Sequence, residues 1–271
     1  MASKYNGSNG QLNSIFTDLT TRIRDEYDNL TLDYGKEEKQ TLQQIQTYCE
    51  QEGITTNNDV TFKYKGYTQK PLLTLHDPVT NKNINLFKDT MPLALRDKEN
   101  FKTILDTIRK IPPEFLEHTD NINFTNFNIK GLNFEGMGSG FHDPRVPKTI
   151  YIMGSSIRTD NNGKIDKHRI ESTIVHEMAH SYDINVYGNG QKTGLNSPFT
   201  NYKGKASGEF PCDYAKENSD ETISTMAQQV YTRTLRSDAT LRSGYRPRDY
   251  EEWESDWHDL VVETKQMLHI P

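Results

Sequence analysis

Two histidines four residues apart are the part of the sequence best suited to chemistry. They are His176 and His180, in the stretch HEMAH, and Glu177 follows the first of them directly. On an α-helix, residues four apart lie on one face, so the two imidazoles can aim at one point. Such a pair makes half of a tetrahedral zinc site. The pattern therefore indicates a zinc centre on a helix; the alternative is a helix whose histidines are ordinary surface or hydrogen-bonded residues.

Glu177 is the candidate general base of this centre. It lies one residue round the helix from His176, close to the metal but not needed as a ligand. A carboxylate in that place can take a proton from a water whose pKa the zinc has lowered. The surrounding apolar residues predict that the helix is buried; they are Ile170, Ile174, Val175, Met178 and Ala179. A buried helix with this inward-facing pattern predicts metal-assisted hydrolysis.

A hydrolytic zinc site needs a third protein ligand and an open position for water. A third histidine six residues after His180 is absent, because Val186 stands there. We therefore expect a carboxylate from a second helix, and the candidates are Glu209, Asp213, Glu217, Asp220 and Glu221. Glu221 is favoured because it opens an amphipathic helix, with Glu217 as its main rival. Glu221 could instead form a capping box with Asn218.

Tyr214 is a candidate for stabilising the transition state. It precedes Glu221 by seven residues. A phenol near the zinc could donate a hydrogen bond to the oxyanion that forms when hydroxide attacks a carbonyl. Because the chain contains 14 tyrosines, a tyrosine of the core or the rim is the alternative.

Composition excludes several classes of function. The formal net charge is -6, and no stretch concentrates basic residues, so we expect no nucleic-acid partner. No apolar run is long enough for a membrane span, and the first ten residues lack the apolar core of a signal peptide. We expect a cytoplasmic protein as written, or one exported after leader removal or by a non-classical route. The sequence does not indicate an oligomeric state.

Periodicity predicts an N-terminal helical hairpin over residues 1–56 and a larger domain over residues 57–271. Apolar residues recur at helical spacing in Leu12–Leu30 and again in Lys36–Gln51. A structural cap is the favoured role of this hairpin, with a regulatory or partner-binding role as the alternative. The two cysteines, Cys49 and Cys212, lack metal-type spacing and are expected to be free thiols.

Short strands and amphipathic helices are expected in the larger domain. Strands are predicted at Val60–Tyr64, Leu72–Leu75, Asn83–Phe87, within Asn121–Phe134 and at Thr149–Met153. Helices are predicted at Lys98–Lys110, Asn218–Arg236 and Arg248–Leu268, with Trp253 and Trp257 of the last one packed in the core. The glycine-rich segment that begins at Gly136 is interpreted as a loop over the cleft, since it lacks nucleotide-binding spacing. Thr149–Met153 is either an edge strand to which an extended peptide could add or an interior strand.

The motif residues resemble those of a known family. HEMAHSYD at His176–Asp183, followed by YAKENSDE at Tyr214–Glu221, resembles the catalytic domain of anthrax lethal factor and its smaller relatives, including the Pro-Pro endopeptidases. The resemblance implies that His176, His180 and Glu221 hold zinc and that Glu177 is the general base. It also implies that Tyr214 stabilises the oxyanion. Asp183 would not bind the metal itself but would stabilise one of the metal ligands. It covers roughly residues 149–236. Thr222, Ser224 and Thr225 depart from it, because more apolar residues are common there in the family.

We therefore expect an α+β, zincin-like fold with a mixed sheet, an active-site helix, a C-terminal helical half and the N-terminal hairpin. The expected function is that of a zinc metalloendopeptidase with one Zn²⁺, which cleaves an internal bond of a peptide or an exposed protein segment. The alternatives are a zinc amide hydrolase that acts on cell-wall peptides, and a catalytically silent zincin used as a binding or structural module.

Overall fold

The computed structural model describes residues 40, 42–57, 62–64, 67–69, 71, 73–87, 97–125, 140–153, 157, 159, 162–187, 210–216 and 219–271. The chain divides into two compact units, Met1–Ile45 and Gln46–Pro271. The first helix of the predicted N-terminal hairpin lies outside the described residues. Residues 42–51 are helical, within the span predicted for the second.

A mixed six-stranded sheet forms the centre of the larger unit. Its strands are β1 (Thr55–Asn57), β4 (Leu73–Asp77), β5 (Lys82–Leu86), β6 (Asn121–Thr125), β8 (Thr149–Met153) and β7 (Gly140–His142), in that spatial order. Strands β5, β6 and β8 are parallel, and the other neighbours are antiparallel. A separate antiparallel pair joins β2 (Phe62–Tyr64) and β3 (Tyr67–Gln69). The mixed sheet and the α+β class are those expected from the sequence.

The register divides the sheet into an apolar and a polar face. Ile84, Ile122 and Ile150 pair side by side across three strands. The next row of the same face contains Leu86, Phe124 and Ile152, and all six side chains are at most 1% exposed. Thr74, Asn85 and Asn123 lie on the other face, where hydrogen bonds of 2.8 and 2.7 Å connect their side chains in turn. These bonds satisfy polar groups that burial would otherwise penalise.

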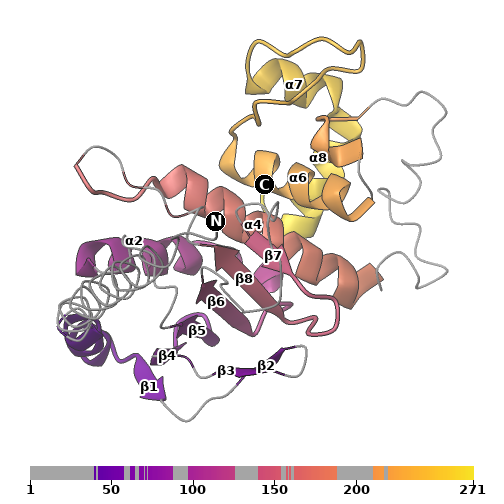
Figure 1. Ribbon diagram of the computed structural model, residues 1–271. Helices are drawn as coiled ribbons and strands as arrows, with labels where there is room; N and C mark the ends of the chain where they lie inside the picture. The colour runs from indigo at the N-terminus through magenta and orange to yellow at the C-terminus, as the bar shows by residue number, and fades with distance from the viewer. Residues whose placement is uncertain are drawn as a thin grey trace, which may run out of the picture. The chain divides into compact units, whose positions relative to one another are not determined.

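Helices from the middle and end of the chain form the rest of this unit. They are α2 (Lys98–Arg109), α3 (Pro113–Leu116), α4 (Lys167–Tyr182), α6 (Ser219–Thr232), α7 (Tyr250–Asp256) and α8 (His258–Leu268). A π-helical turn, Asp183–Tyr187, continues α4, and a 3₁₀ turn, Tyr214–Lys216, precedes α6. Figure 1 shows α4 lying between the sheet and helices α6 and α8. The helix with the HEMAH motif is therefore covered on both sides, in agreement with its predicted burial.

Two expectations about individual elements were wrong. Gly140–His142 is not loop but the edge strand β7, which pairs antiparallel with β8. Of the two positions considered for Thr149–Met153, the interior one is confirmed, because this strand lies between β6 and β7. The helix predicted at Arg248–Leu268 is two helices, because the backbone of Trp257 leaves helical geometry at φ -105° and ψ 24°. Trp253 and Trp257 are fully buried, as predicted.

No helix among the described residues is long and apolar enough to cross a membrane.

Candidate metal centre

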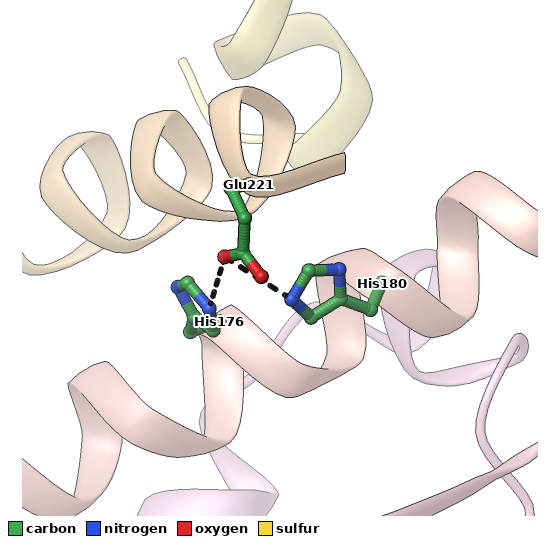
Figure 2. A group of neighbouring side chains, drawn as sticks. All are labelled: His176, His180 and Glu221. Carbon is green, nitrogen blue, oxygen red and sulfur yellow. Dashed lines mark ion pairs between the residues drawn. The ribbon is translucent and has the colours of Figure 1, made fainter. Parts of the chain in front are cut away.

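Three side chains from two helices converge on one point. Nε2 of His176 lies 3.2 Å from Oε2 of Glu221, and Nε2 of His180 lies 3.5 Å from the same oxygen. One ligand atom from each residue lies within 4.8 Å of the others. Figure 2 shows the two imidazoles of α4 facing the carboxylate that descends from α6. The structure thus brings together the three residues that the sequence suggested as ligands.

The spacing and chemistry of these donors fit a zinc ion. Zinc bonds to histidine nitrogen and carboxylate oxygen are about 2.0–2.2 Å long, so the edges of a tetrahedral site measure about 3.3–3.5 Å. The two nitrogen–oxygen distances, 3.2 and 3.5 Å, are close to that range. Two imidazoles and a carboxylate are also the donors of a catalytic zinc site that leaves one position for water. Nδ1 of His176 has no hydrogen-bond partner among the described residues.

Helix α4 positions the two histidines through its capping and its burial. The carboxylate of Asp166 caps the helix by accepting a hydrogen bond of 3.2 Å from the backbone N–H of Arg169. Ile174, Val175 and Met178 are fully buried. Because these apolar side chains fix the rotation of the helix, the histidine face is turned toward α6 rather than toward the sheet.

Helix α6 brings Glu221 to the centre on its first turns. Ile223, Met226 and Ala227 are buried in the packing of α6. The hydroxyl of Thr222 donates a hydrogen bond of 2.8 Å to the backbone oxygen of Ala215, which ties α6 to the 3₁₀ turn before it. Thr222, which departs from the lethal factor pattern, is therefore a buried residue whose hydroxyl connects α6 to the 3₁₀ turn. Asn218, the other half of the proposed capping box, lies outside the described residues.

Burial and the mutual contacts of these groups shift their pKa values strongly. Burial lowers the pKa of His176 to about 4, which favours the neutral imidazole that a metal requires. Burial alone would raise the pKa of Glu221, but hydrogen bonds from the two histidines outweigh it and hold the pKa well below its ordinary value. An anionic carboxylate of Glu221 beside the neutral imidazole of His176 matches the protonation state that a zinc ligand set needs.

Glu177 lies directly beside this centre and under the edge of the sheet. It is 5% exposed, and burial raises the pKa of its carboxyl to about 8. A Cβ placed on Gly140 of β7 would lie 2.5 Å from Cγ of Glu177 and 2.5 Å from its Oε1. Because real Cβ contacts are not that short, any side chain at this position would displace the carboxyl group of Glu177. Gly140 was missed as a site residue because the glycine-rich segment suggested a loop.

A cavity of about 510 Å³ opens beside the centre, and His176, Glu177 and Tyr214 contribute to its lining. The ring centroid of Tyr214 lies 6.1 Å from that of His176. The guanidinium carbon of Arg236 lies 4.8 Å from the tyrosine ring, and the carboxylate of Asp238 accepts a hydrogen bond of 3.0 Å from the Tyr214 backbone. The 3₁₀ turn thus holds Tyr214 beside both the candidate ligands and the candidate base.

The other acidic residues that the sequence suggested do not join the three candidate ligands in the described part of the structure. Asp213 is exposed, and Asp183 is buried at the end of α4. Glu209 and Glu217 lie outside the described residues, as does the side chain of Asp220. Arg169 and Arg236, which line the cavity, were missed because nothing in their sequence context separates them from the other 30 basic residues among the 32 lysines and arginines.

No family model matches the chain, and no curated protein or solved structure matches it at a significant level. The resemblance to the lethal factor family consequently depends on the motif residues alone.

Proposed function

We propose that this protein is a zinc-dependent metalloendopeptidase. The observation that carries the proposal is the convergence of His176, His180 and Glu221 within 4.8 Å of one another, with the carboxylate of Glu177 buried beside them. The adjoining cavity of about 510 Å³ is of a size to receive part of a peptide. Zinc is preferred over harder cations because imidazole nitrogen makes up two of the three donors.

Each residue has a separate role in the proposed reaction. A zinc ion in this donor set supplies Lewis acidity, which lowers the pKa of a bound water and polarises a carbonyl. Glu177 accepts the proton of the attacking water and delivers it to the leaving amine, because its carboxyl is buried directly beside the candidate ligands, where such a proton would be released. Tyr214 donates a hydrogen bond to the developing oxyanion.

Metal analysis tests the ligand set. Purified protein is expected to contain about one zinc per chain, and Glu221→Ala is expected to lose it, because removal of one of three protein ligands leaves only the histidine pair. Asp213→Ala is the matched control, since Asp213 was a candidate of the same kind but is exposed. Equal zinc content in Glu221→Ala and Asp213→Ala would exclude Glu221 as a ligand.

Peptide cleavage tests the base. Zinc-loaded wild-type protein is expected to cleave internal bonds in a mixed peptide library, whereas Glu177→Gln is expected to retain zinc and lose at least about 100-fold in kcat. Full activity of the glutamine variant would rule out the mechanism. Stoichiometric zinc without cleavage of any peptide, but with release of cell-wall fragments, would favour the amide hydrolase. Absence of zinc under all loading conditions would favour a silent binding or structural module.

A further inference from the structure

The cavity beside the metal centre continues along the groove between α4 and α6. Arg169, Ser172 and His176 lie on one stripe of α4, with spacings of three and four residues, and all three line the cavity. Gln228 lines it from α6, seven residues after Glu221, and Arg236 and Ser237 also line it. The candidate metal centre is at one end of the groove. Arg169 and Gln228 lie about two helical turns away from it along α4 and α6.

Arg169 has no ion-pair partner among the residues that the structure describes. Its Nε is buried and has no hydrogen-bond partner among them. Its backbone is engaged: the N–H donates to Asp166, and the carbonyl oxygen accepts a hydrogen bond from Thr173. A buried guanidinium donor without an acceptor is costly, and an incoming anion would relieve that cost.

Arg236 differs from Arg169 because its charge is already shared. Its Nε donates a hydrogen bond of 2.9 Å to Oδ1 of Asp238, and its guanidinium packs on the ring of Tyr214. The only carboxylate among the described lining residues is Glu177, which stands at the metal end of the groove. Apart from Glu177 and the candidate metal centre, the described lining therefore combines one neutralised guanidinium, that of Arg236, and one without an ion-pair partner, that of Arg169, with neutral hydrogen-bonding side chains.

We infer that this groove is a specificity subsite for a carboxylate of the substrate, with Arg169 as its principal determinant. The inference rests on the proposed function, to which it adds a substrate class: peptides with an acidic group near the bond that is cleaved. The separation of seven positions along α4 from Arg169 to His176 corresponds to about 10 Å. An extended peptide covers that length in about three residues. The carboxylate thus belongs within about three residues of the scissile bond.

Peptide libraries with glutamate or glutamine fixed at each position around the cleaved bond test the subsite. Glutamate at one position is expected to raise kcat/KM at least about 10-fold over glutamine, the effect of a charge-assisted hydrogen bond. In Arg169→Gln this preference is expected to disappear, and the loss is expected in the KM for the glutamate peptides. A second pair of peptides, with a free or an amidated C-terminus, shows whether a side chain or a chain end supplies the carboxylate.

Arg248→Gln is the matched control, because Arg248 is exposed and pairs with Glu252 away from the cavity. It should retain the full preference for glutamate. A wild-type protein that cleaves peptides without any preference for an acidic group, or an Arg169→Gln variant that keeps the preference, would overturn the subsite and leave the proposed function intact.

Binding distinguishes the two proposals if no library is cleaved. Fluorescence anisotropy of labelled glutamate-fixed and glutamine-fixed pools measures binding to wild-type protein and to Arg169→Gln without turnover. Tighter binding of the glutamate pool, lost in Arg169→Gln, would support the subsite even if the peptidase proposal failed. Equal binding of the two pools would overturn the subsite.

Discussion

At the scale of single residues, the contact between Gly140 and Glu177 is the tightest constraint on the site. Gly140 pairs with Ile152 in the register of the sheet, and its missing side chain leaves the space that the glutamate occupies. Elsewhere on this face the same row contains large apolar residues such as Phe124 and Leu86. The edge strand therefore has glycine where the side chain of Glu177, the proposed general base, lies beneath it.

Gly140→Ala is expected to reduce activity without loss of metal. The added Cβ would force the carboxylate of Glu177 away by about an ångström, and a displacement of that size can cost on the order of 100-fold in kcat. Zinc content should stay unchanged, because the added Cβ meets Glu177 and none of the three candidate ligands. Steady-state kinetics and metal analysis on the same preparation measure this result.

The shorter side chain of aspartate provides the control for that steric effect. Glu177→Asp alone should lower kcat, but in the Gly140→Ala background it should cost much less, since the aspartate leaves the crowded space. Additive effects in this double-mutant cycle would mean that the two residues act independently.

The two cysteines provide a separate prediction at this scale. Cys49 and Cys212 are both fully buried, and burial raises the pKa of Cys49 to about 12 and also raises that of Cys212. Because the thiolate is the reactive form, neither thiol should react with Ellman's reagent in native protein within minutes. Both should react at once in denaturant. Rapid modification of one thiol in the native protein would contradict its placement in the core.

At the scale of elements, an ion pair joins the end of helix α2 to the β4–β5 hairpin. Nη2 of Arg109 lies 2.8 Å from Oδ1 of Asp77, whose side chain is fully buried. Thr80 donates a hydrogen bond of 2.7 Å to the same carboxylate from the hairpin turn. Burial alone would raise the pKa of Asp77, but these hydrogen bonds outweigh it and hold the pKa below its ordinary value of 3.8.

Asp77→Asn is expected to lower the free energy of unfolding by about 3 kcal/mol at pH 7, since it leaves the guanidinium of Arg109 without its buried partner. The folded-state pKa of Asp77 is depressed, so its contribution to stability is present above pH 3.8 and is lost as pH falls through the folded-state pKa. The difference between wild type and variant should therefore shrink in strong acid. Urea unfolding at several pH values measures it.

Asp120→Asn is the control for this pair, because Asp120 forms a half-exposed ion pair with Lys148 at 3.7 Å. Its effect should stay within about 0.5 kcal/mol at every pH. A loss in Asp77→Asn no larger than in this control would mean that the buried pair does not fasten α2 to the sheet.

Elements with a strong local period were predicted well from the sequence. The strand Thr149–Met153 has the predicted bounds, and α2 begins at the predicted Lys98 and ends one residue before the predicted end. The two features that were predicted wrongly, strand β7 and the break between α7 and α8, have no such periodic signal in the sequence. Strand β7 is three residues long and depends on pairing with β8, and the break at Trp257 interrupts an unbroken helical period. Non-local pairing and local backbone breaks are not encoded in periodicity.

At the scale of the whole molecule, the motif residues of the candidate site could be predicted from the sequence, whereas the residues around them could not. His176, Glu177 and His180 follow from spacing on one helix, and Glu221 from the chemistry that a third ligand requires. Gly140 and Arg169 come from segments with no such spacing, and the tertiary structure alone brings them to the same cavity. The sequence thus predicted the proposed catalytic chemistry, whereas the proposed specificity depends on how α4, α6 and the sheet edge meet.

A metal that links α4 to α6 should also stabilise the fold as a whole, because the two helices supply ligands from segments that are distant in the sequence. Zinc present at 100 times its dissociation constant is expected to add about 2.7 kcal/mol to the free energy of unfolding. For a protein of this size that corresponds to a rise in Tm of roughly 5–10 °C. Thermal unfolding with zinc and with a chelator measures the shift in wild type, and Glu221→Ala should show almost none. An equal Tm in zinc and in chelator for the wild-type protein would show that no ion joins the two helices, because an ion bound only to the folded state must raise its stability.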